Sequence, residues 1–211
     1  MKLCMFSPRD MDLERGWPGR IDGDRVIQLA AQTLQSFFTG GGEAREHAEY
    51  ALDDVLLRTP VLHPPSVRVF GDEGDFAFAN PASIYGPEDE IPLPPGAGYI
   101  ESDLRIAAVI GTEGAVGGYT LVNDWVAPEL TGAKARDFGI SLGPVLVTPD
   151  EFPSGGDWTP LVEQAARGTR LYAGDVIAAG SMRDGPYVPG DVVELEFDGI
   201  GVLRTPMRAN P

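Results

Sequence analysis

The sequence predicts an α+β fold that is mainly β, with a small α/β part at its amino-terminal end. The 211 residues include 27 glycines and 19 prolines along the whole chain, which is typical of short strands joined by turns. Beyond residue 63 the apolar residues form runs of strand length, whereas helical spacing is largely confined to the first 57 residues.

The amino-terminal part begins with an apolar run, residues 2–6, that predicts a strand. Two short apolar pieces then flank Asp22-Gly23, and this turn sequence favours a tight hairpin over residues 20–27. Apolar residues at helical spacing predict a helix over residues 26–38, which ends at three consecutive glycines. A second helix is predicted over residues 43–57.

The stiff segment His63-Pro64-Pro65 marks the predicted domain boundary, because its prolines disfavour a helix. We therefore expect a small amino-terminal domain of residues 1–62 and a second domain of residues 63–211. The second domain has one predicted helix, over residues 161–166. Its predicted strands are residues 99–111, 118–126, 142–148, 175–179 and 192–197.

The chain is strongly acidic, with 32 Asp and Glu against 16 Lys and Arg and a formal net charge of −16. Nucleic acids and anionic membranes bind basic surfaces, so neither is expected as a partner. No apolar run reaches the ~18 residues of a membrane helix, and the start lacks a signal-peptide pattern, so we expect a cytoplasmic protein. Cys4 is the only cysteine, which excludes a disulfide framework.

The second domain contains an ordered set of motifs that is more specific than its composition. The set comprises Ile106 to Gly111, Gly118 to Trp125, Lys134 to Pro144, Gly174 to Ile177, Pro189 to Leu195 and Gly199 to Arg204. In this order and spacing the motifs resemble the fumarylacetoacetate hydrolase family over roughly residues 60–208. The resemblance implies a mixed β-roll that forms homodimers, in enzymes that hydrolyse C–C bonds, decarboxylate, hydrate or isomerise 2-oxo acids.

The resemblance also implies a Mg²⁺ or Mn²⁺ site, held by a Glu-x-Glu pair on one strand and an Asp on the next. Alignment on the first motif places Asp103 and Arg105 at the two Glu positions and Asp124 at the third. Arginine has only donors and cannot ligate a cation. Glu101 and Asp103 share a strand face, so a two-residue shift offers an alternative metal set of Glu101, Asp103 and Asp124.

Other departures from the family concern the lid and the substrate loop. The segment that corresponds to the lid, residues 70–76, is short and has no histidine. The loop that grips a substrate carboxylate in the family keeps only its Gly180-Ser181 start. Lys134 and Asp137 are present in a matched motif, and Trp125 lies in another. The resemblance therefore gives Asp103, Ser181, Trp125 and Asp137 as candidate substrate-binding residues.

We expect a remodelled family member that acts on a small oxo or enol carbonyl substrate, in a lyase, isomerase or cyclase reaction of specialised biosynthesis. Lys134 and Arg105 would form a cationic site that replaces the metal, with Asp103 and Asp124 orienting them. No cofactor is then needed. One alternative is a Mg²⁺- or Mn²⁺-dependent hydrolase or decarboxylase of 2-oxo acids, and another is a non-catalytic binding or scaffold protein.

Overall fold

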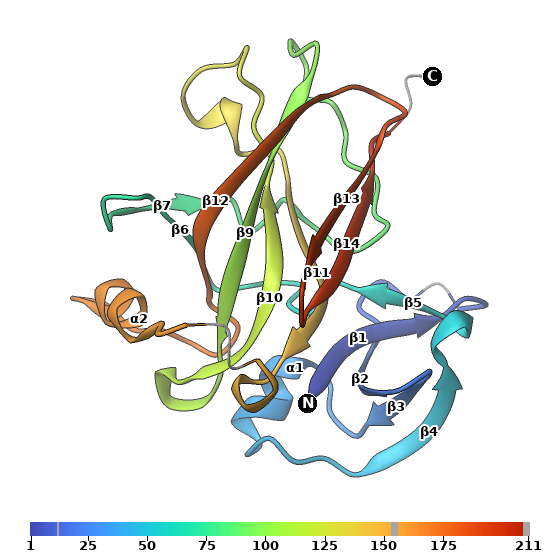
Figure 1. The fold of residues 1–211 in the computed structure, drawn as a ribbon. Coiled ribbons are helices and arrows are strands. Elements are labelled where there is room, and N and C mark those ends of the chain that lie inside the picture. The colour runs from blue at the N-terminus through green and yellow to red at the C-terminus, as the bar shows by residue number, and fades with distance from the viewer. Residues whose placement is uncertain (12, 153–155, 209–211) are drawn as a thin grey trace.

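The computed structural model describes residues 1–11, 13–152 and 156–208 and confirms the mainly β, α+β fold class (Figure 1). The first strands are β1 (Lys2–Pro8), β2 (Trp17–Asp22), β3 (Arg25–Leu29), β4 (Glu46–Ala51), β5 (Val55–Arg58), β6 (Val67–Phe70) and β7 (Phe76–Ala79). The later strands are β8 (Ile84–Tyr85), β9 (Ile100–Ile110), β10 (Val116–Asp124), β11 (Ile140–Val147), β12 (Val176–Tyr187), β13 (Val192–Phe197) and β14 (Gly201–Pro206). The α-helices are α1 (Leu34–Thr39) and α2 (Thr159–Ala166), and the 3₁₀ helices are η1 (Leu52–Asp54), η2 (Thr112–Gly114), η3 (Gly132–Ala135) and η4 (Pro149–Glu151).

In the described part of the chain, twelve strands form one mixed sheet in the order β4-β3-β2-β1-β11-β10-β9-β12-β6-β7. Strand β5 joins β1, and β8 joins β11. The long strands β9, β10 and β12 run through the middle of the molecule, while β1 to β5 lie at one end of it (Figure 1). β13 and β14 form a separate hairpin.

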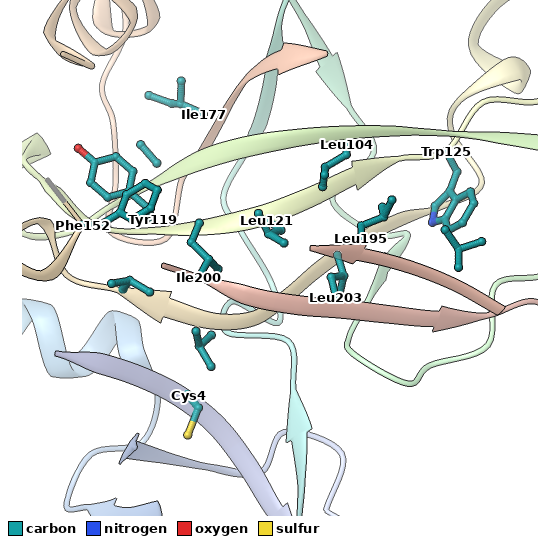
Figure 2. Close-up of a cluster of buried hydrophobic side chains, with 14 of the residues drawn as sticks. Cys4, Leu104, Tyr119, Leu121, Trp125, Phe152, Ile177, Leu195, Ile200 and Leu203 are labelled. Atoms are coloured by element: carbon teal, nitrogen blue, oxygen red, sulfur yellow. The ribbon is translucent and has the colours of Figure 1, made fainter. Parts of the chain in front are cut away.

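Alternate residues of the central strands enter two different cores, as the two-residue period of a strand requires. Leu104 and Leu121 belong to one apolar cluster, to which Leu195 and Leu203 of the β13–β14 hairpin contribute (Figure 2). Their neighbours Ala107, Val109, Val122, Val176 and Ala178 belong to a second cluster on the opposite face. We call this opposite face the site face, because the candidate site extends it.

The central strands and the later helix were predicted correctly, but the two amino-terminal helices were not. The segment 26–38 is divided between β3 and the short α1, which ends at the predicted glycines. The segment 43–57 forms β4, η1 and β5, because the free edge of β3 pairs with β4 and thereby favours an extended chain. The predicted Asp22-Gly23 hairpin is confirmed, with Gly23 at φ 60°.

The predicted boundary at residues 62/63 falls between β5 and β6. β1 pairs directly with β11, so the amino-terminal strands continue the sheet of the second part. The division into two domains stays a prediction. Within the described residues, none of the helices has the length and apolar character needed to cross a membrane.

Candidate functional site

The candidate site lies where the polar ends of β9 and β10 meet. Asp103 and Arg105 alternate with buried Leu104 on β9 and therefore point to the site face with Ala107. Asp124 ends β10 two residues after Val122 and points to the same face. Strand geometry thus brings two carboxylates and one guanidinium together at the edge of an apolar core.

Arg105 is 7% exposed and is held by three strong hydrogen bonds. Its Nη1 donates to the carbonyl oxygens of Phe70 at 2.9 Å and of Gly180 at 2.6 Å. Its Nη2 donates to Asp103 Oδ2 at 2.7 Å. A buried charge requires such partners, since an unpaired one is very costly. Arg105 therefore joins β9 to the β6–β7 hairpin and to β12.

Asp103 is fully buried and accepts from more than one side. Ser181 Oγ donates to its Oδ1 at 2.6 Å. Beyond Arg105, the guanidinium of Arg136 lies 3.7 Å and that of Arg183 lies 3.8 Å from its Oδ2. The carboxylate is thus saturated by cationic and hydroxyl donors.

Asp124 is 2% exposed and has one satisfied and one unsatisfied carboxylate oxygen. Its Oδ2 accepts from Arg136 Nη1, whereas its Oδ1 is buried without a hydrogen-bond partner among the described residues. Burial raises the pKa of Asp124, and the nearby guanidiniums of Arg136 and Arg105 oppose this rise. An acid with a raised pKa and a free oxygen is suited to proton transfer.

A half-open cleft of about 230 Å³ lies over these groups. Its polar floor is formed by Arg105, Asp124 and Arg136. Its remaining lining comes from the β6–β7 hairpin, namely Val69, Phe70, Gly71 and residues 75–79. In this cleft Arg105 and Asp124 face a common space large enough for a small molecule.

The structure does not bring Lys134 to this cleft. Its side chain is 79% exposed on η3 and its ammonium pairs with Asp137 at 2.8 Å. Trp125 is fully buried on the opposite face from Asp124, where its Nε1 donates to Ser141. Glu101 continues the site face of β9 beyond Asp103, and its backbone pairs with that of Val126. Of the candidates, Asp103, Arg105, Asp124 and Ser181 converge.

Sequence reasoning missed Arg136 and the β6–β7 hairpin. Arg136 lies two residues after Lys134 in the same motif, and only the course of the loop after η3 shows which of the two cations turns inward. The hairpin offered a signal, because Val67 to Phe70 and Phe76 to Ala79 are strand-like runs around a Gly-containing turn.

The donor set does not fit a divalent cation. Asp103 accepts from Ser181 and Arg105, and Asp124 accepts from Arg136 through Oδ2, so a cation bound here would lie beside guanidinium groups and could use only Asp124 Oδ1 without displacing one of these donors. Among residues 1–11, 13–152 and 156–208, no group of three or more His, Cys, Asp or Glu side chains is arranged to hold a metal. Mg²⁺ and Ca²⁺ sites are built from several convergent oxygens.

Comparison with known sequences identifies relatives of this chain. Residues 45–159 match the family described as fumarylacetoacetate (FAA) hydrolase C-terminal. An uncharacterized protein of Methanocaldococcus jannaschii is 31% identical over 182 residues, which cover 67% of this chain and 76% of that protein. The mitochondrial oxaloacetate tautomerase of Xenopus laevis is 24% identical over 288 residues, covering 98% and 90% of the two chains.

Solved structures of related enzymes share the whole fold. Maleylpyruvate hydrolase from Sphingobium sp. SYK-6 superposes with a TM-score of 0.81 at 21% identity, and 5-carboxymethyl-2-hydroxymuconate delta-isomerase from Mycobacterium smegmatis with 0.79 at 25%. Both comparisons cover 100% of each chain. The same hydrolase has been seen with manganese(II) and pyruvate, and 2-keto-3-deoxy-D-arabinonate dehydratase with magnesium.

Proposed function

This chain belongs to the fumarylacetoacetate hydrolase family, a family of enzymes, and on that premise we propose that it catalyses a metal-independent proton transfer on a small oxo or enol acid. The reaction class is that of an isomerase, with lyase and cyclase reactions as extensions of the same enol chemistry in a biosynthetic pathway. The observation that supports it most strongly is the buried Arg105–Asp103 pair beside Asp124, whose Oδ1 is unpaired.

Arg136 would bind the substrate carboxylate. Its side chain is 35% exposed and covers Asp124, so an incoming carboxylate competes with Asp124 for the same guanidinium. A guanidinium fork matches a carboxylate in a bidentate arrangement. Substrate binding thereby draws Arg136 away from Asp124 and uncovers the acid-base group.

Asp124 would then move the proton. As a carboxylate it removes the proton on the carbon next to the oxo group, the C–H electron pair forms the C=C bond, and the oxo oxygen becomes an enolate. Arg105 and Arg136 stabilise this anion electrostatically. Return of the proton from Asp124 to the oxygen gives the enol, and return to another carbon of a conjugated substrate gives an isomer.

The two alternatives make different demands on the site. A metal-dependent hydrolase or decarboxylase needs Glu101, Asp103 and Asp124 as ligands, and the pairing of both aspartates with arginines disfavours it. A non-catalytic binding or scaffold homologue needs no acid-base group. We also propose a homodimer and a small-molecule substrate, with neither nucleic acid nor membrane as partner.

The proposal is tested by following keto-enol interconversion of oxaloacetate and of phenylpyruvate through the ultraviolet absorbance of the enol, with protein dialysed against a chelator. We expect acceleration that survives chelation and is lost in Asp124→Asn. Activity that requires added Mg²⁺ or Mn²⁺ would establish the metal-dependent alternative. Binding of both acids without acceleration would establish the non-catalytic one.

A further inference from the structure

The wall of the cleft that the β6–β7 hairpin provides is largely apolar, and strand pairing shows which of its side chains face the site. Val69 lies opposite Ala77 in the β6–β7 hairpin and opposite Ala178 in β12. Ala178 in turn lies opposite Ala107 on β9, two residues from Arg105. Directly opposed residues point to the same face of a sheet. Val69 and Ala77 therefore share the site face with Arg105.

The aromatic residues of the hairpin turn the other way. Phe70 and Phe76 are paired with each other. They join the apolar cluster to which the β13–β14 hairpin contributes. Phe78 lies opposite Arg68, whose guanidinium is 5.3 Å from its ring centroid. Phe70, Phe76 and Phe78 also line the cleft, whereas strand pairing directs Val69, Ala77 and Ala79 to the site face, where they offer methyl groups and no hydrogen-bonding group.

The charges of the site match one anionic group. In the described part of the chain, three arginines lie around two carboxylates. The arginines are Arg105, Arg136 and Arg183, and the carboxylates are those of Asp103 and Asp124. This cluster alone has a surplus of one positive charge, which Asp75, also in the lining of the cleft, balances. Asp75 belongs to the β6–β7 turn and not to the arginine cluster, and the whole chain carries −16. A second carboxylate placed against the hairpin would meet Asp75 and alanine methyl groups.

The volume of the cleft indicates how much of a ligand it can enclose. A cleft of about 230 Å³ corresponds to about eight waters at ~30 Å³ each. Because the cleft is half-open, this volume describes only its enclosed part, which accommodates a carboxylate and the first apolar atoms of a tail.

From these observations we infer that the cleft selects a substrate with a single carboxylate head and a short apolar tail, and that Ala77 is a residue that determines this specificity. The inference rests on the proposed function, because it describes the substrate of the same site. Burial of each tail methylene against Val69, Ala77 and Ala79 favours binding, whereas a terminal carboxylate there loses hydration and gains no cation.

The test measures binding and requires no turnover. Calorimetry compares 4-methylpentanoate, a monocarboxylate with an apolar tail, with glutarate, a dicarboxylate of similar length. We expect 4-methylpentanoate to bind at least about tenfold more tightly, the ratio that burial of two methylenes provides. Ala77→Lys places an ammonium opposite the arginines and should reverse the preference. Ala77 is exposed on an edge strand, where lysine is well tolerated.

Ala115→Lys is the matched control, because it adds the same charge at an exposed turn that does not line the cleft. Equal or tighter binding of glutarate by the parent, equal effects of the two lysine variants, or no binding of either anion would overturn the inference. Proton transfer that prefers oxaloacetate would overturn it and leave the proposed function intact. The expected preference without any proton transfer would overturn the proposed function alone.

Discussion

Arg105 donates to the carboxylate of Asp103 at 2.7 Å, although the two residues are only two positions apart on β9. Both side chains are almost fully buried, and the same guanidinium reaches two carbonyl oxygens on other strands. The pair therefore has a structural and an electrostatic role at one point, since it neutralises Asp103 and provides a fixed positive charge beside Asp124.

Removal of Arg105 should destabilise the protein. A cation on a solvated strand end would instead contribute little to stability. Breaking a buried ion pair typically costs 3–5 kcal/mol. Asp103 would still have Ser181 and Arg136 as partners, so we expect the lower value. Arg105→Ala should therefore reduce the free energy of unfolding in urea by about 3 kcal/mol. The double variant with Asp103→Ala should lose less than the sum of the single variants. A loss below about 1 kcal/mol for Arg105→Ala would contradict this.

The structure points to Arg136 as the functional cation, whereas the sequence pointed to Lys134, and variants of the two residues distinguish these hypotheses. Arg136→Ala should lower kcat/KM for phenylpyruvate interconversion by ~10²–10³, the usual effect of losing one electrostatic donor. Lys134→Ala should stay within about twofold of the parent, because this exposed side chain contacts Asp137 and not the cleft. The reverse ranking would restore Lys134 as the functional cation.

Asp124 should make stability depend on pH in a defined direction. Its pKa is raised by burial above 3.8, so between 3.8 and the folded-state pKa the native state binds more protons than the unfolded state. Its contribution to stability is therefore present at low pH and is lost as the pH rises through this window. Relative to Asp124→Asn, the parent should lose stability over that rise in urea unfolding at a series of pH values. A relative gain would mean that the ion pair with Arg136 outweighs burial.

Divalent metals should bind weakly, because Arg105 and Arg136 occupy the carboxylates that would ligate them. At ~4 Å, like unit charges repel by ~4 kcal/mol at an effective dielectric of 20, and a divalent ion doubles this. Calorimetry should detect no micromolar affinity for Mg²⁺ or Mn²⁺ in the parent. Arg105→Glu combined with Arg136→Ala should raise the affinity, since it supplies a third carboxylate and frees Asp124. Micromolar binding by the unchanged protein would refute the pairing argument.

The protein should be a dimer in solution. Apolar side chains are exposed along β12 to β14, where Met182 is 57% exposed and Val192 is 44% exposed. Several such residues on neighbouring strands are typical of a surface that another chain covers. Light scattering should give about twice the 22.5 kDa of the chain at micromolar concentration. A single-chain mass at that concentration would count against the dimer.

The sequence predicts the central sheet well, because β9 contains the apolar run Ile106 to Ile110 and because β10 and β11 are rich in apolar residues of strand type. It fails over residues 43–57, where helical spacing of apolar residues is overridden by pairing of β4 with β3. Local patterns do not record which distant strand offers a free edge. For the same reason the contact between Arg136 and Asp124 was not predicted, because it depends on the course of a loop whose sequence has no periodicity.

The pairing of β1 with β11 has a consequence for biosynthesis. Leu3 lies opposite Leu146, so the start of β1 has one of its sheet neighbours near residue 147. At ~5–20 residues per second, a ribosome needs about 7–30 s to pass from one strand to the other. During that interval β2 covers one edge of β1 and β5 covers Met5–Pro8 of the other, so only the Lys2–Leu3 end of that second edge is open to foreign strands. The nascent chain thus depends on its own late segments, or on chaperones, to shield its earliest strand.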